Sequence, residues 1–186
     1  RAEATFGKTW VFGRHDGQSI ATRILAGAGI AYGNSTSLPF EKHFYSGGSN
    51  SMRGWQVRTL GPGISQRDQS FVIPNQTGDM KLEANFEYRF DIVWKIAGAG
   101  FIDVGNVWTL NDKTSNEESM FKWRRFGESL AANWGVGLRF NLGFLLLRFD
   151  WGFKVHDPAR ENKWVGPDKW LKNDGSAFHF GVGYPF

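Results

Sequence analysis

The sequence predicts an all-β chain that forms about seven strands of a transmembrane antiparallel β-barrel. Three observations predict this fold. Apolar and polar residues alternate with a period of two, several alternating segments reach ten residues or more, and short connections take turns with long ones. A tilted strand needs about 9–11 residues to cross a bilayer, whereas strands of globular sheets usually have about five or six.

The first two expected strands carry the weakest pattern. Residues 5–13 are predicted to form a strand, but the pattern does not show which of its faces is apolar. Residues 19–33 are predicted to form a second strand with one apolar side. That side consists of Ile20, Ile24, Ala26, Ala28, Ile30 and Tyr32.

The third expected strand, from Met80 to Asp91, has the clearest alternation, because its apolar and polar residues take turns without an error. The apolar face consists of Met80, Leu82, Ala84, Phe86, Tyr88 and Phe90. The polar face consists of Lys81, Glu83, Asn85, Glu87, Arg89 and Asp91.

Four further segments repeat the pattern up to the end of the chain. From 94 to 108, the apolar face holds Trp94, Ile96, Ile102, Val104 and Trp108, opposite Lys95, Phe101 and Asp103. From 134 to 141, it holds Trp134, Val136, Leu138 and Phe140, opposite Gly135, Gly137, Arg139 and Asn141. From 145 to 153, it holds Leu145, Leu147, Phe149, Trp151 and Phe153, opposite Leu146, Arg148, Asp150 and Gly152. From 178 to 186, it holds Phe178, Phe180, Val182, Tyr184 and Phe186, opposite His179, Gly181, Gly183 and Pro185.

The connections between these segments alternate in length. Short connections are expected at 15–17, 91–93 and 141–143, and long ones at 34–78, 109–130 and 156–176. Outer-membrane barrels have this arrangement, with tight turns on the periplasmic side and long loops outside.

A soluble β-sandwich or lipocalin-like barrel is the structural alternative, since such folds also alternate. Their inward face fills a dry core. Here the polar face carries closely spaced charges, and burying them unpaired in a small core would cost several kcal/mol each. A wide lumen avoids that cost, so the pattern favours the membrane barrel. Aromatic residues at strand ends also fit the interfacial girdles of such barrels: Trp94, Trp108, Trp134, Trp151, Trp164, Trp170 and Phe186.

Seven strands cannot close a bacterial single-chain barrel, which has an even number of at least eight, and an open edge in lipid leaves backbone groups unsatisfied. We therefore expect residues 1–186 to be the C-terminal part of one larger barrel, with upstream strands outside this chain. The sequence has no apolar run long enough for a transmembrane helix, no Cys and no run of like charges that would indicate nucleic-acid binding.

Two motifs are specific enough to suggest a family. The long connection contains the pair Gly47 and Gly48, followed by Arg53, Gly54 and Trp55, and the segment from Gly98 to Gly105 has a Gly-x-Gly-aromatic-x-Asp-x-Gly pattern centred on Asp103. These two motifs, together with the aromatic C-terminal residue Phe186, resemble the pattern of the BamA/TamA superfamily of outer-membrane assembly factors. The resemblance extends from about residue 18 to the end.

The resemblance implies that the Arg53 loop folds back into the lumen of a 16-stranded barrel. There Arg53 would meet a carboxylate, and both Asp103 and Glu87 have the inward phase, so these acids are its expected partners. Gly47, Gly48 and Gly54 would permit tight backbone conformations, and Trp55 would wedge the loop against the wall.

The resemblance further implies an insertase in the outer membrane of a Gram-negative bacterium, with periplasmic domains upstream. A lateral gate between the first and last barrel strands would accept nascent outer-membrane proteins as clients. The last strand is the expected gate and includes Phe180, Gly181, Gly183, Tyr184 and Phe186. Membrane lipids and accessory assembly proteins are the other expected partners.

Two alternatives remain open: a polypeptide-secretion pore of the two-partner type, which shares these motifs, and a barrel that anchors or exports a passenger domain. We expect no enzyme activity, because the inward phase offers His179 without a neighbouring Ser. We also expect no cofactor, no metal site and no nucleic-acid partner.

Overall fold

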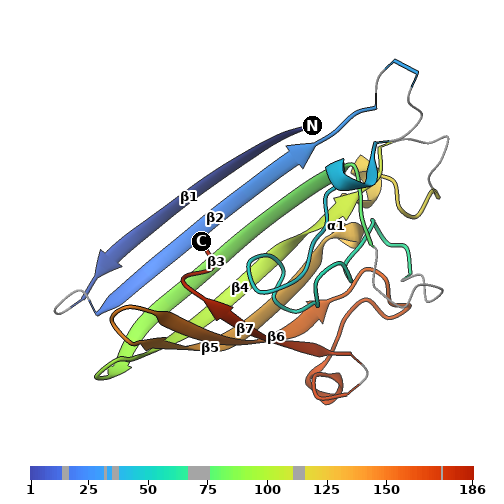
Figure 1. The fold of residues 1–186 in the computed structure, drawn as a ribbon. Coiled ribbons are helices and arrows are strands. Elements are labelled where there is room, and N and C mark those ends of the chain that lie inside the picture. The colour runs from blue at the N-terminus through green and yellow to red at the C-terminus, as the bar shows by residue number, and fades with distance from the viewer. Residues whose placement is uncertain (14–16, 32, 35–37, 67–75, 111–115, 173) are drawn as a thin grey trace.

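The computed structural model describes residues 1–13, 17–31, 33–34, 38–66, 76–110, 116–172 and 174–186. Within them, seven strands form one antiparallel sheet in sequence order (Figure 1). The strands are β1 (Ala2–Phe12), β2 (Gln18–Ala28), β3 (Met80–Val93), β4 (Ile96–Trp108), β5 (Ala131–Asn141), β6 (Leu146–His156) and β7 (Ser176–Val182). Short helical turns are η2 (Phe40–Lys42), η3 (Trp123–Arg125), α1 (Phe126–Ser129) and η4 (Pro167–Lys169).

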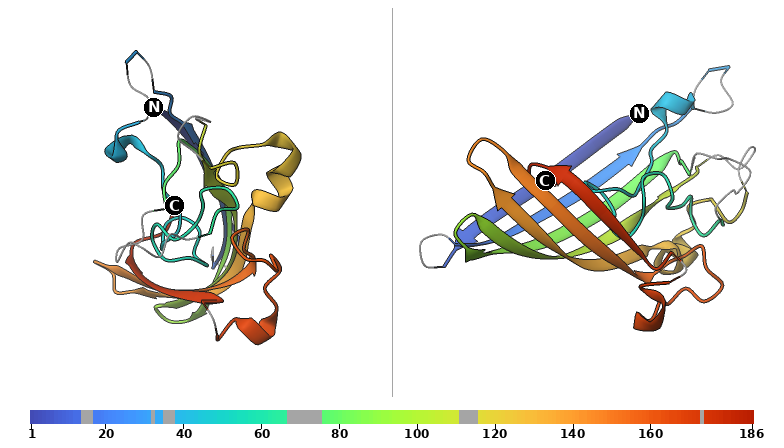
Figure 2. Two further views of the ribbon diagram at one scale, coloured as in Figure 1. Left: turned by 90° about the vertical axis from the view of Figure 1, so that its right-hand side faces the viewer. Right: turned by 60° about the horizontal axis from the view of Figure 1, so that its bottom comes forward.

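The sheet curves into an open trough rather than closing on itself (Figure 2). Residues 43–64 of the connection between β2 and β3 and the C-terminal end lie on the concave side, whereas α1 lies on the convex side. Strands β1 and β7 are the two edges of this sheet within the part of the chain that the structure describes. In the same residues, no helix combines the length and the apolar character that crossing a membrane would require.

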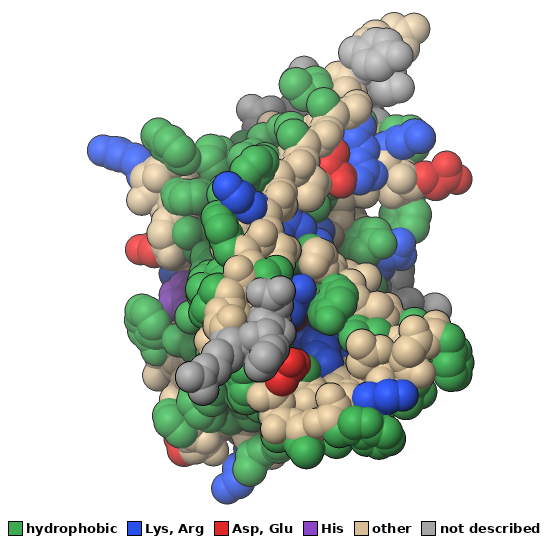
Figure 3. All heavy atoms as spheres, turned by 90° about the vertical axis from the view of Figure 1, so that its left-hand side faces the viewer, with side chains coloured by type: hydrophobic (Ala, Val, Ile, Leu, Met, Phe, Trp, Pro, Cys, Tyr) green, Lys and Arg blue, Asp and Glu red, His purple; other side chains and the backbone are tan. Residues whose placement is uncertain are grey.

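The two faces of the sheet follow the predicted phases. On the concave side, the five charged residues Glu83, Glu87, Arg139, Arg148 and Asp150 are each at most 1% exposed. On the convex side, Phe86, Leu138 and Phe180 are 41%, 44% and 57% exposed, and Leu82, Leu147 and Phe149 are half-buried. Figure 3 shows hydrophobic side chains along the outer perimeter and Lys and Arg side chains inside the hollow. A sandwich with a dry apolar core is therefore excluded.

The structure corrects the expected strand ends. Strand β3 continues to Val93, so the turn falls at Trp94, which has a positive φ of 50° and is 89% exposed. Strand β2 ends at Ala28, before Ile30. The expected turn at 15–17 and residue Tyr32 fall largely or wholly outside the described residues.

Strand β7 ends at Val182 and not at Phe186. The last ladder bond runs from the Gly183 N–H to the Leu146 carbonyl, and a positive φ of 80° at Gly183 turns the chain away from the sheet. Pro185 has no N–H with which to resume pairing. Phe186 consequently lies on the concave side near Arg23, and the prediction that it belongs to an outer aromatic girdle is wrong.

Trp108 also departs from its predicted place in an exposed girdle, because it is fully buried. Its ring packs against Phe121 and Phe126 at centroid distances of 5.6 and 5.8 Å. Its indole N–H donates to the Ser129 hydroxyl at 3.0 Å. The long connection between β4 and β5 thus folds down and covers this ring.

Candidate functional site

The concave face holds a buried ion pair between the long connection and the sheet. The Arg53 guanidinium, which is 0% exposed, donates from Nε to Asp103 Oδ2 at 3.0 Å and from Nη2 to Asp103 Oδ1 at 2.8 Å. Its Nη1 donates to Glu87, and its backbone N–H donates to Asp103 Oδ2 at 3.1 Å. The bidentate contact matches the fork of the guanidinium to the two carboxylate oxygens.

Three neighbouring strands place Asp103 where this fork can reach it. Asn85 on β3 and Asn133 on β5 are its register partners, and both amides donate to its carboxylate, at 2.9 and 3.0 Å. Phe101, two residues earlier on β4, lies under the guanidinium with 3.6 Å from the Arg53 Cζ to the ring centroid. The Asp103 carboxylate therefore accepts hydrogen bonds from both neighbouring strands as well as from the loop.

The charge state of Arg53 follows from these contacts. Burial by itself would lower the pKa of the guanidinium, but the charges of Asp103 and Glu87 and the hydrogen bonds to Asp103 outweigh it, so its pKa is raised above its ordinary value. Arg53 therefore stays positively charged and holds the loop through its ion pairs.

The ion pair continues into a network along the concave face. Glu87 also pairs with Arg89 at 2.7 Å and with Arg139 at 3.2 Å, and Arg139 pairs with Asp150 at 2.6 Å. Glu87 and Asp150 each lie next to guanidinium groups, which is the arrangement of a network of structural ion pairs. Among the described residues, no group of three or more His, Asp and Glu side chains is placed to hold a metal ion.

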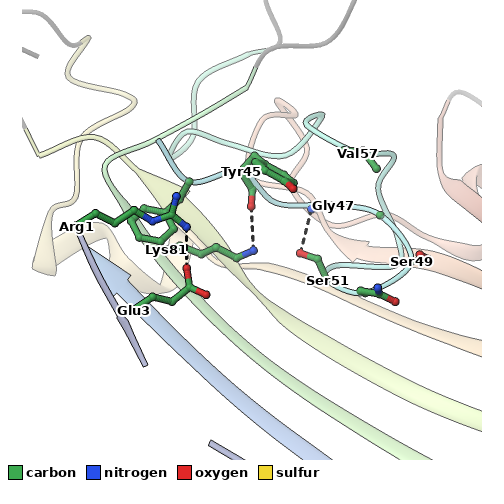
Figure 4. A pocket seen from close by; sticks show the side chains of 11 residues that line it. Arg1, Glu3, Tyr45, Gly47, Ser49, Ser51, Val57 and Lys81 are labelled. Atoms are coloured by element: carbon green, nitrogen blue, oxygen red, sulfur yellow. Dashed lines mark hydrogen bonds and ion pairs between the residues drawn. The ribbon is translucent and has the colours of Figure 1, made fainter. Parts of the chain in front are cut away.

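Polar residues before Arg53 anchor the same loop at further points. The Ser46 hydroxyl donates to Glu83 at 2.5 Å, and the Ser51 hydroxyl donates to the same carboxylate. Arg148 donates to the Asn50 side-chain oxygen at 2.6 Å. Asn50 and Ser51 also line a cavity of about 340 Å³ between the loop and strands β1 and β3 (Figure 4).

Glycines let the loop approach this closely. Gly47 and Gly48 have φ values of 92° and 98°, which residues with a Cβ rarely adopt. A Cβ at Gly54 would lie 2.7 Å from the Asn133 Cβ, and one at Gly152 of β6 would lie 2.2 Å from the Arg53 carbonyl oxygen. Gly152 thus leaves room for the loop tip within the wall itself.

Trp55 closes the loop against the wall, as the sequence predicted. Its side chain is 2% exposed and forms a buried cluster with Met52, Leu60 and Ala131. The Lys154 ammonium lies 5.1 Å from its ring centroid.

Replacing Gly152 with alanine should displace the loop tip, because the new methyl group would overlap a backbone carbonyl that has little freedom to move. We expect a loss of about 1–3 kcal/mol in unfolding free energy and faster protease cleavage within residues 38–66. The matched control is Gly100→Ala on β4, where a Cβ would have no atom within 4 Å. Equal protease resistance of the two variants would contradict the assigned role of Gly152.

The C-terminal residues meet the loop from the other side. Phe180 points outward, is 57% exposed and packs on Phe149 at 5.2 Å. A Cβ at Gly181 would lie 2.6 Å from Arg148 Nη2. Beyond the strand, the Arg89 Cζ lies 4.3 Å from the Tyr184 ring centroid, and Arg89 donates to the Phe186 carbonyl at 3.3 Å.

Four contributors to this site were not singled out in the sequence: Asn85, Asn133, Phe101 and Gly152. All four lie on the concave side, so the period-2 phase contained a signal for them. His179 was expected to point inward and does so, with its Nε2 3.1 Å from the Arg53 carbonyl oxygen. The alternation predicts which residues point inward, but it does not predict which of them lie beneath the loop.

Known proteins are similar to this chain in sequence and in fold. The family described as the Omp85 superfamily domain matches residues 1–186. The chain is similar to the outer membrane protein assembly factor BamA of Neisseria meningitidis serogroup B, with 31% identity over 124 residues, 61% of this chain and 15% of that protein. The crystal structure of BamA from Haemophilus ducreyi lacking POTRA domains 1–3 has the same fold, with a TM-score of 0.65 and 16% identity over 97% of this chain and 33% of that one.

Proposed function

We propose, from the premise that the chain belongs to the Omp85 superfamily, that it is the C-terminal part of a barrel that inserts proteins into the outer membrane. The chain spans 15% of the length of the similar assembly factor and 33% of the similar structure. The remaining strands would then come from upstream segments of a longer protein. We place this protein in the outer membrane of a Gram-negative bacterium, among lipids, nascent outer-membrane clients and accessory assembly proteins.

The shortness of β7 is the observation that carries this proposal. It has 7 residues, whereas the other six strands have 11 to 14. The Gly183 N–H makes the last bond of the ladder, and the chain then turns inward, so residues 184–186 add no further rungs. A seam between β7 and a first barrel strand would therefore rest on few hydrogen bonds, and it would open at lower cost than the longer pairs from β1–β2 to β5–β6.

An opened seam presents unpaired backbone groups at the level of the bilayer. Lipid cannot satisfy them, so an incoming strand that pairs with the edge lowers the free energy of both partners. The ion pair of Arg53 with Asp103 and Glu87 supports this scheme, because it keeps the loop and the middle of the sheet rigid while the edge moves.

Site-specific photo-crosslinking in the full-length protein tests the proposal. A photoreactive residue in place of Phe180, which points outward on β7, should capture a nascent outer-membrane protein during its assembly. The matched control is the same residue in place of Phe86, which is also exposed on the convex face but lies on β3. Capture at position 86 equal to that at 180, or none at 180, would contradict insertion at this seam.

A further inference from the structure

The loop end of the sheet carries an outer rim built from two chain segments, residues 121–129 and 163–172, which we call the rim segments. The first packs onto the convex face through Phe121 and Phe126, which cover the buried Trp108. Trp123 stands on these two rings, with centroid distances of 5.6 and 5.5 Å. The segment is therefore held against the outside of the barrel wall by an aromatic cluster, as the position of α1 in Figure 2 shows.

The second rim segment packs onto the same face further along the sheet. Trp170 lies against the outward rings of Trp134 and Phe153 at 5.3 and 5.2 Å. Its indole N–H donates to the Lys154 carbonyl at 2.9 Å. Both segments thus fold down over the outside of the wall instead of extending away from it.

An ionic contact joins the two rim segments. Lys163 donates to Glu128 at 3.2 Å, and Arg125 lies 3.8 Å from the same carboxylate. The hydrogen bond from Lys163, with the charges of Lys163 and Arg125, holds the pKa of Glu128 below its usual range, so this contact persists at neutral pH. The Lys163–Glu128 contact thus links the two rim segments on the outside of the sheet.

The exposed side chains of the rim segments include both apolar groups and cations. Trp123 is 78% exposed and Leu171 is 74% exposed. Arg124, Arg125 and Lys172 are exposed beside them, and Arg124 and Lys172 form no ion pair within the described residues. Exposed Trp next to Lys or Arg is the composition of protein surfaces at a membrane–water interface, where the ring enters the headgroup layer and the cation stays wet.

We propose that the rim segments bind the phosphate-bearing headgroups of the lipid leaflet at the loop end of the barrel. Trp123 and Leu171 would enter the leaflet, and Arg124, Arg125 and Lys172 would contact lipid phosphates. The rim continues the apolar convex face, which places it at the depth of the headgroups. The inference rests on the membrane placement in the proposed function, but it does not require client insertion.

Lipid binding by the full-length protein in detergent micelles, measured by native mass spectrometry, tests this inference. The probes are lipid A and its dephosphorylated derivative. Each cation near a lipid surface contributes roughly fivefold to affinity, so Arg124→Gln/Arg125→Gln/Lys172→Gln should weaken binding of lipid A by about a hundredfold. The same variant should bind the dephosphorylated lipid as the wild type does.

A triple variant with the same charge change away from the rim, Arg1→Gln/Lys42→Gln/Arg58→Gln, is the matched control and should bind lipid A within about twofold of the wild type. In bilayer nanodiscs, a nitroxide attached at Trp123→Cys should be more accessible to oxygen than to a water-soluble nickel chelate. Wild-type affinity of the rim variant for lipid A, or a water-exposed nitroxide, would overturn the inference. A dimer whose interface shields position 123 from water would also overturn the inference. None of these readouts depends on client assembly, so the proposed function can fail independently.

Discussion

Replacing Arg53 with alanine is expected to lower the unfolding free energy of the full-length protein by about 3–5 kcal/mol. The substitution leaves the Asp103 carboxylate, which is 0% exposed, with amide donors but no cation, whereas Glu87 keeps its ion pairs with Arg89 and Arg139. An uncompensated buried charge costs more than the pair itself contributes to stability. Urea unfolding in detergent, followed by tryptophan fluorescence, measures the loss.

Three further variants identify the cause of that loss. Arg58→Ala changes the same loop at a cation that lies over the rings of Phe40 and Tyr45, at 5.2 and 4.9 Å, and forms no ion pair within the described residues, so it should cost less than about 1 kcal/mol. Arg53→Lys keeps the charge but loses the bidentate fork and should fall between the two. In Arg53→Ala/Asp103→Asn, removing one stranded charge should restore part of the stability. Equal losses for the alanine variants at positions 53 and 58 would show that the buried pair is not the anchor.

A disulfide across the seam should abolish client assembly, and reduction should restore it. One cysteine would replace Phe178 on β7, and the other would occupy the facing position on the first barrel strand of the full-length protein. The cross-link prevents the seam from opening, so a client strand has no free edge to pair with. Assembly of outer-membrane clients in reconstituted vesicles, before and after addition of a reductant, measures the effect.

The control disulfide joins two strands that stay paired in the proposed cycle. Phe149 on β6 and Phe180 on β7 are register partners on the convex face, and facing residues of antiparallel strands lie within reach of a disulfide. Cysteines at these two positions should leave client assembly unchanged. Full assembly with the seam completely cross-linked would favour a route through the lumen, as in the secretion-pore alternative.

The two faces of the sheet could be predicted from sequence because alternation in a strand is a local property. Successive side chains point to opposite sides whatever surrounds the strand, so the phase of Glu87 and Asp103 was known before any neighbour was. The partnership of these acids with Arg53 needed one more premise, the resemblance that implied a loop folded into the lumen. The resemblance and the alternation of the strands together restricted the partner of Arg53 to a few inward-pointing carboxylates.

The ends of the elements and the covering of the rings depended on tertiary contacts. The alternation of Phe178, Phe180 and Val182 continues through Phe186, yet the left-handed conformation at Gly183 turns the chain inward, where Arg89 holds Tyr184. Trp108 has the phase of an exposed ring, and only the fold of the following connection buries it under Phe121 and Phe126.

The sequence by itself therefore determined the strands, their faces and the identity of the anchored loop, since these depend on residue order within one segment. The tertiary structure alone decided where β7 stops and which outward rings are covered, because those outcomes depend on side chains that are distant in the sequence.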